Sequence, residues 1–266
     1  MAFVAPKVIL TPLLIASTTL AGRRWGALLS GWLIALPLTS GPICLFITLE
    51  GGPTAGVAAA TGALVGAGAE VAFSLGYLFA GADARWTRAL ATASLAYVAA
   101  TTVLSIVLPS NPPLLFVLDL ASFAAGLAVL RSRRSDAPLT VVRPGRWDIP
   151  ARALVATILV LTISGVAPIV GGHAAGILAT YPVYVSVLTS FAHRVAGRSQ
   201  ALAVVRGLLL GMPGFATFFL TVATTLPTWP VVAAFAAAVA GALGVNLAIL
   251  LVSLRLGEAR RRANAA

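Results

Sequence analysis

The chain of 266 residues has only one cysteine, Cys44, so it can form neither an intrachain disulfide nor a cysteine zinc site. It also lacks an HExxH helix motif, a Gly-x-Ser-x-Gly turn, a P-loop and any cluster of Cys and His residues. Metal, serine and nucleotide chemistry therefore lack their residues. We expect no enzyme activity, no cofactor and no bound metal, and the lone cysteine does not indicate a redox compartment.

Charge is the second shortage, because only 9% of the residues are charged while 59% are hydrophobic. Several apolar stretches approach twenty residues without a charge, which is the length of a membrane-spanning helix. The composition predicts an all-α polytopic membrane protein whose main partner is the lipid bilayer. The first apolar stretch lacks a basic segment before it and a clear cleavage site, so we expect it to be retained as a helix.

The apolar stretches predict about nine transmembrane helices. Their expected positions are 6–21, 25–49, 54–80, 88–108, 112–130, 151–170, 173–193, 199–224 and 228–254.

Connections that carry arginine alternate along the chain with connections that carry almost no charge. The arginine-bearing ones lie at 23–24, 85–88, 131–146, 194–198 and 255–262. Basic connections mark the cytoplasmic side of a membrane protein. We therefore expect a bacterial inner-membrane protein with its N-terminus outside and its C-terminus in the cytoplasm, although Lys7 does not fit this pattern. This explanation accounts for most of the formal charge of +11, and no nucleic-acid partner is expected.

The two halves of the chain match when one is shifted by 145 residues without a gap. The shift aligns, among others, Gly31 with Gly176, Pro37 with Pro182, Gly52 with Gly197, Gly62 with Gly207 and Gly66 with Gly211. We infer two four-helix repeats, at 1–110 and 151–256. A linker transmembrane helix at 111–131, a basic cytoplasmic loop at 132–150 and a cytoplasmic tail at 257–266 complete the expected organisation. Because five helices separate equivalent positions, the second repeat should cross the membrane upside down.

The segment "AGILATYPVYVSVLTSFAHRVAGRSQALAVVRGLLLGMPGFATFF" resembles the GlpM-type small bacterial inner-membrane proteins. The shared marks are a Gly followed six residues later by a Pro, an Ala-His-Arg-like end to the second helix, and the spacing of the third helix. The resemblance covers 151–254 and, more weakly, 6–108. It implies an architecture, a four-helix unit duplicated and fused through an added helix, and it supplies no catalytic residue or substrate.

Two predicted spans carry helix breakers near mid-membrane. Pro37 and Pro42 lie in "GWLIALPLTSGPICLF", and Pro182 lies at the matching place in the second half. Broken backbone is costly in lipid, so we expect it to face protein or a wet cavity, unless the prolines merely kink tilted helices. Hydroxyl groups surround these prolines, and the candidate site residues are Pro37, Thr39, Ser40, Tyr181, Pro182 and Tyr184.

Ionisable residues inside predicted spans are the other candidates. Glu70 and Arg206 lie at similar depths in corresponding helices, which allows an ion pair between them. The alternatives are that Arg206 snorkels to the inner surface and that Glu70 is a protonated structural carboxyl. Asp119 in the linker helix is expected to be a hydrated cap or a packing acid. His173 and His193 fall at opposite membrane edges and cannot share one metal.

Inverted repeats with interrupted helices are typical of secondary transporters. The sequence therefore predicts a small secondary transporter or a flippase for a small-molecule or lipid-linked substrate, with the site between the repeats. The alternative is a non-transporting accessory protein of an envelope or polysaccharide machine, and an intramembrane enzyme is a third option. A cavity that reaches Glu70 and both broken helices would favour the transporter.

Overall fold

The computed structural model describes residues 4–38, 40–81, 84–132, 147–166, 169 and 172–263. All the secondary structure of these residues is helical, as the composition predicts. The helices are α1 (Val4–Trp25), α2 (Ala27–Ile34), α3 (Ser40–Phe79), α4 (Trp86–Val107), α5 (Pro112–Ser132), α6 (Asp148–Val166), α7 (Gly172–Ala179), α8 (Val183–Ala196), α9 (Arg198–Thr225) and α10 (Val231–Ala263).

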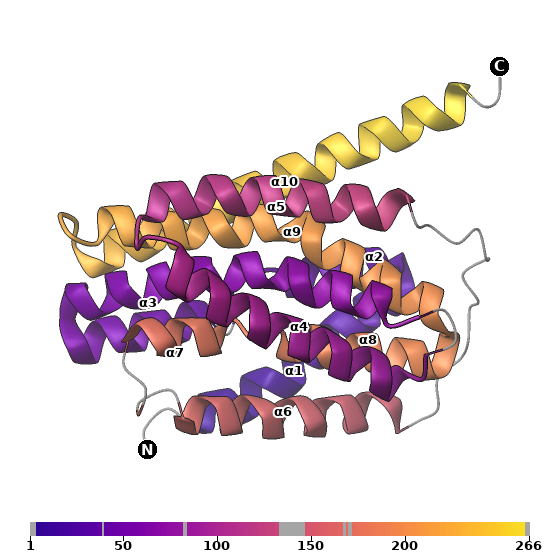
Figure 1. Cartoon of the computed structure of the whole chain (residues 1–266), viewed down its shortest axis with the longest axis horizontal. Helices are drawn as coiled ribbons and strands as arrows, with labels where there is room; N and C mark the ends of the chain where they lie inside the picture. Colours follow the sequence, from indigo (N-terminus) through magenta and orange to yellow (C-terminus); the bar gives the residue numbers. More distant parts are fainter. Residues whose placement is uncertain are drawn as a thin grey trace.

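The chain runs back and forth along the long axis of the molecule (Figure 1). The N-terminal end lies at the lower left, and α10 projects from the body toward the C-terminus at the upper right. Figure 1 also shows the α3–α4 connection, the α8–α9 connection, the end of α5 and the start of α6 at the right-hand end. These segments carry Arg85, Arg88, Arg131, Arg194 and Arg198, so arginine gathers at one end of the molecule.

Within the part of the chain that the structure describes, five helices are long and apolar enough to cross a membrane: α3, α4, α5, α9 and the part of α10 from Val231 to Val252. Most of α3 and α9 is buried inside the protein, whereas most of α4, α5 and α10 is not. The outer helices expose large apolar side chains such as Leu95, Ile106 and Val232. A surface this apolar is stable in a lipid bilayer rather than in water.

The first predicted interruption is present, and it separates α2 from α3. The backbone N–H groups of Leu36 and Leu38 donate to Leu33 O and Leu36 O instead of to residues four positions earlier. Regular pairing resumes where Gly41 N donates to Pro37 O at 3.0 Å. Pro42 was expected to contribute a break, but it lies in the first turn of α3, where a missing N–H is tolerated.

The second predicted interruption separates α7 from α8 and has the same hydrogen-bond pattern. Tyr181 N donates to Leu178 O, Val183 N to Tyr181 O and Ser186 N to Pro182 O, each 145 residues after its counterpart in the first break. A further bend follows in each half at a glycine with positive φ, Gly52 (φ 79°) inside α3 and Gly197 (φ 85°) between α8 and α9. Glycine adopts this conformation without steric cost.

The helix boundaries themselves repeat with the 145-residue shift. Helix α2 maps onto α7, and α4 maps onto the segment Val231–Val252 of α10. The expected single helix at 25–49 is divided between α2 and the first part of α3, and the one at 173–193 is divided between α7 and α8. Helix α10 continues to Ala263, into the expected tail at 257–266. Most of the expected loop at 132–150 lies outside the described residues.

Close helix packing at glycine is reciprocal between the halves. Helix α2 packs on α9 and α7 packs on α3. A Cβ atom at Gly207 would overlap Leu28 O, and one at Gly62 would overlap His173 O. These two contacts are related by the same shift, which explains why the glycines at 62 and 207 match. The lack of side chains there lets each short helix lie directly on the long helix of the other half.

Candidate functional site

Both broken helices line one small cavity. It has a volume of about 40 Å³ and lies where α2, α3, α7, α8 and α9 meet. Its lining comprises Ile34, Ala35, Leu36, Ser40, Glu70, Ala179, Thr180, Tyr181, Pro182, Val183, Tyr184, Val185, Leu208, Met212 and Phe215. A buried water needs roughly 10–15 Å³ of such volume, so the cavity holds about two or three waters or one small ion.

Most of the candidate residues predicted from the sequence come together at this cavity. Ser40, Glu70, Tyr181, Pro182 and Tyr184 all line it. Of the remaining three, Pro37 accepts a backbone hydrogen bond in the first break but is not part of the lining, and Thr39 lies outside the described residues. Arg206, the third, is not part of the lining.

Glu70 is the acidic residue of the cavity, and it is placed there by the middle of α3. The residue is 5% exposed, and its Oε2 atom has no hydrogen-bond partner among the described residues. A buried carboxylate without a cation costs several kcal/mol, whereas a protonated carboxyl or a carboxylate with a bound cation avoids that cost. The cavity beside Glu70 leaves room for such a cation or for water.

Tyr97 of α4 completes the second break, and sequence analysis missed it. Its hydroxyl contacts Thr180 Oγ1 at 2.8 Å and donates to Ile177 O at 3.1 Å. The Thr180 hydroxyl also donates to Ile177 O at 2.6 Å, so this carbonyl at the end of α7 is fully satisfied. A tyrosine in an otherwise apolar span could have been recognised, since a buried phenol hydroxyl needs a polar partner.

Tyr181 links the same break to α4 by a second contact. Its hydroxyl lies 2.9 Å from Ser94 Oγ, and its ring packs edge-to-face on Tyr97 with centroids 5.5 Å apart. The broken backbone is thus held by hydroxyl groups from a neighbouring helix. This arrangement agrees with the expectation that a break within the apolar layer faces protein or a cavity.

The ion pair that the sequence allows between Glu70 and Arg206 is not among the salt bridges of the described residues. Their salt bridges join Asp148 to Arg23 and to Arg152, each at 3.0 Å. Arg206 instead donates from Nε and Nη2 to Leu130 O, in the last turn of α5. A cation is favourable at the carboxyl end of a helix, where carbonyl groups lack partners.

Helix polarity adds to the chemistry of the cavity. The carboxyl ends of α2 and α7 and the amino ends of α3 and α8 all meet there. Carbonyl oxygens at the first pair of ends attract cations, and N–H groups at the second pair attract anions. Because Glu70 adds a carboxyl group with an unpartnered oxygen, the cavity favours a proton or a small cation over an anion.

The polar side chains of the cavity do not follow the match between the two halves. The 145-residue shift pairs Glu70 with Phe215 and Thr180 with Ala35, and all four residues line the cavity. Each pair therefore supplies one polar and one apolar side chain. The cavity lies between matched elements, but its polar groups are not symmetric.

The other ionisable candidates lie outside the cavity. Asp119 is 4% exposed, which makes it a packing acid rather than a hydrated cap, and its Oδ2 atom has no partner among the described residues. His193 Nδ1 lies 2.8 Å from the hydroxyl of Tyr77, and the backbone oxygen of His173 faces Gly62. Among the described residues no group of three Cys, His, Asp or Glu residues could hold a metal.

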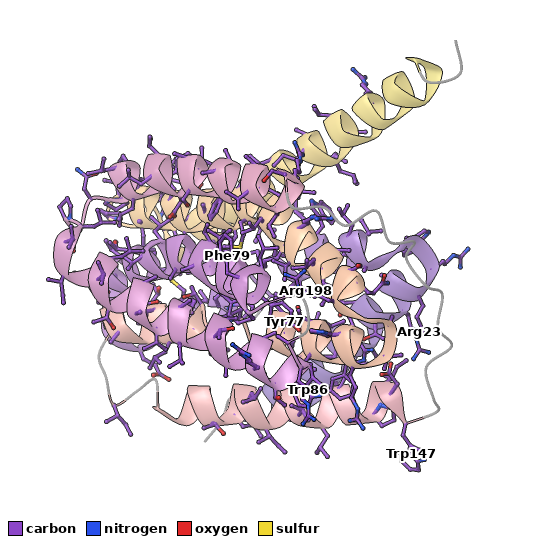
Figure 2. All side chains as sticks on the ribbon, turned by 45° about the vertical axis from the view of Figure 1, so that its right-hand side comes forward. Arg23, Tyr77, Phe79, Trp86, Trp147 and Arg198 are labelled. Atoms are coloured by element: carbon purple, nitrogen blue, oxygen red, sulfur yellow. The ribbon has the colours of Figure 1, made fainter. Side chains whose placement is uncertain are left out.

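Figure 2 shows Tyr77 close to Arg198, near the centre of the view, and Arg23 toward its right-hand edge. Arg198 donates a hydrogen bond to Leu78 O and so joins the start of α9 to the end of α3. Comparison with protein families, curated proteins and solved structures finds no significant match to the chain. The functional argument therefore depends on the geometry of the cavity.

Proposed function

We propose that the chain crosses a bacterial inner membrane nine times, as two inverted four-helix repeats joined by α5. The matched helix boundaries and matched breaks support this arrangement. The reciprocal contacts support it further, because a twofold relation makes residue i of one half contact residue j of the other and the reverse. An odd number of crossings between matched positions then inverts the second repeat, as a fused GlpM-like duplication would.

The gathering of arginine at one end of the molecule supports a cytoplasmic assignment of that end. A reporter that is active only in the cytoplasm should then be active when it is fused after Arg262. A tag placed before α1 should be accessible only from outside. Labelling of both termini on the same side of the membrane would contradict the nine-crossing arrangement.

We further propose that the protein is a small secondary transporter whose site is the cavity between the repeats. The observation that carries this proposal is that one cavity is lined by both broken helices and by Glu70. Transporters of this architecture bind their ligand at the repeat interface and expose it alternately to each side. The bends at Gly52 and Gly197 are the points at which the arms of each half can tilt.

The size of the cavity restricts what it can hold in this conformation. A volume of about 40 Å³ accommodates a small ion with little water and excludes the head group of a lipid-linked substrate. Carboxyl, hydroxyl and backbone carbonyl oxygens are the ligands that hard cations prefer. We therefore propose that Glu70 exchanges a proton for a small monovalent cation.

Alternating access can be tested with a single cysteine at the cavity. Ser40→Cys in a Cys44→Ala background should react with a membrane-impermeant maleimide added to either face of sealed vesicles. The matched control is Ser74→Cys, because Ser74 is fully buried in α3 and does not line the cavity. An accessory protein with a packed interior predicts that both cysteines are equally unreactive, and this result would reject the transporter.

The role of Glu70 needs a separate measurement. Proteoliposomes that contain a pH-sensitive dye should show proton movement when a Na⁺ or K⁺ gradient is imposed. Glu70→Gln should abolish this movement, whereas Glu50→Gln should not, because Glu50 is exposed at the bend of α3. Equal proton movement in the two variants would remove Glu70 from the proposed mechanism.

A further inference from the structure

A second and larger cavity lies between α4, α6 and α8, away from the junction of the broken helices. Its volume is about 280 Å³. The lining residues are Trp86, Leu90, Val155, Leu159, Ser186, Val187, Ser190, Phe191 and Arg194. Figure 2 shows Trp86 near α6 and α8, at the end of the molecule where arginine gathers. We call this cavity the α4–α6–α8 groove.

The groove is apolar along its length and basic at its mouth. Its walls are aliphatic and aromatic, and Arg194 is exposed at the end of α8. Two buried serines lie on the same helix face, Ser190 about one turn from Arg194 and Ser186 about two turns, or ~6 and ~12 Å along the helix axis. Their hydroxyls have no hydrogen-bond partner among the described residues, at exposures of 6% and 3%.

Asp148, at the start of α6, already has two arginine partners. Asp148 accepts from Arg23 and from Arg152, and the Arg152 guanidinium lies 5.0 Å from the centre of the Phe191 ring. The salt bridges of the described residues do not include Arg194. The mouth of the groove therefore carries excess positive charge, which complements an anion.

We propose that the α4–α6–α8 groove binds an anionic phospholipid of the surrounding bilayer. An acyl chain lies between the apolar walls, and the phosphate pairs with Arg194. One helical turn deeper, an ester oxygen accepts a hydrogen bond from the hydroxyl of Ser190. The volume approaches the ~300 Å³ at which ligand pockets begin. Basic pockets between membrane helices are known to bind anionic lipid head groups. This site does not depend on the transport proposal.

The test uses the full-length protein, purified and delipidated in detergent. Phosphatidylglycerol or phosphatidylcholine with identical acyl chains is added, and bound lipid is counted by native mass spectrometry while thermal stability is followed in parallel. We expect phosphatidylglycerol to bind and raise the melting temperature, and phosphatidylcholine at the same concentration to do so much less.

Two arginine variants separate a specific contact from general positive charge. Arg194→Gln should weaken phosphatidylglycerol binding about fivefold, since one basic residue near an anionic lipid contributes roughly 1 kcal/mol. Arg88→Gln removes the same charge from an exposed position outside the groove and should change binding less than twofold. Arg194→Lys keeps the charge and should restore most of the affinity.

A third variant tests the apolar part of the groove. Leu159→Trp fills the groove and should displace phosphatidylglycerol even though Arg194 is intact. Three results would overturn the proposal: equal binding of the two lipids, equal loss in Arg194→Gln and Arg88→Gln, or unchanged binding in Leu159→Trp. If Arg194→Gln misfolds, Arg194→Lys takes its place in the comparison. Failure of Arg194→Lys to bind phosphatidylglycerol would also count against the site.

Discussion

Replacement of Gly211 by alanine tests the helix packing that brings the first break to the cavity. Gly211 lies in α9, and a Cβ atom there would stand 2.5 Å from the Cβ of Ala35 and 2.8 Å from Trp32 O. Non-bonded carbon atoms are in contact at ~3.5–4.0 Å, so α2 and the break would have to move away by about 1 Å or more. Overpacking of this kind typically costs ~1–3 kcal/mol.

The measurement is thermal unfolding of the purified protein in detergent. A chain of this size changes its melting temperature by about 2–4 °C per kcal/mol, so Gly211→Ala should lower it by roughly 2–12 °C. Gly244→Ala is the matched control, because Gly244 lies in α10 with nothing within 4 Å of its Cβ position. Alanine there should be neutral or stabilising by up to ~1 kcal/mol, since it favours the helix.

The matched position in the other half extends the test. Gly66 corresponds to Gly211, and a Cβ atom at Gly66 would overlap the hydroxyl of Thr180 in the second break. Gly66→Ala should therefore destabilise the protein at least as much as Gly211→Ala. If Gly211→Ala unfolds at the same temperature as Gly244→Ala, the close approach of α2 to α9 is refuted.

Three further comparisons between variants test contacts described above by the same melting assay. Tyr97→Phe should cost ~1–3 kcal/mol because it leaves a buried hydroxyl and carbonyl less satisfied, and an unchanged melting temperature would contradict this account. Asp148→Asn should destabilise by ~3–5 kcal/mol, more than Arg23→Gln, because it strands the buried Arg152 without its counter-charge. Glu70→Gln and Arg206→Gln should be additive within ~0.3–0.5 kcal/mol, and a larger coupling energy would revive the ion pair.

The two breaks were predictable from sequence for local reasons. Proline lacks a backbone N–H wherever it occurs within a helix, so Pro37 and Pro182 indicated interruptions without knowledge of the surroundings. The matching glycines at 62 and 207 were informative because the close contact between two helices leaves no room for a side chain at either position. The position of the first break was less predictable, since Pro42 interrupts nothing once it falls in the first turn of α3.

The assignment of Arg206 as partner of Glu70 failed for a geometric reason. Depth counted along a helix gives one coordinate, whereas the direction of a side chain around the helix axis depends on how the helix is rotated in its packing. The residue matched to Glu70 by the repeat is Phe215, and this residue does line the same cavity. The repeat thus contained better information about the neighbours of Glu70 than the depth estimate did.

The sequence alone determined that the chain is an all-helical protein suited to a bilayer, with two related halves and two interrupted helices, because hydropathy, glycine spacing and proline act within one segment. Only the tertiary structure decided that the interruptions share one cavity with Glu70, that Tyr97 holds the second break and that Arg206 serves the end of α5. The hydrogen bonds of Tyr97 and Arg206 join residues that lie 76 to 83 positions apart in the chain. Their formation depends on helix rotation and close packing, which no single segment encodes.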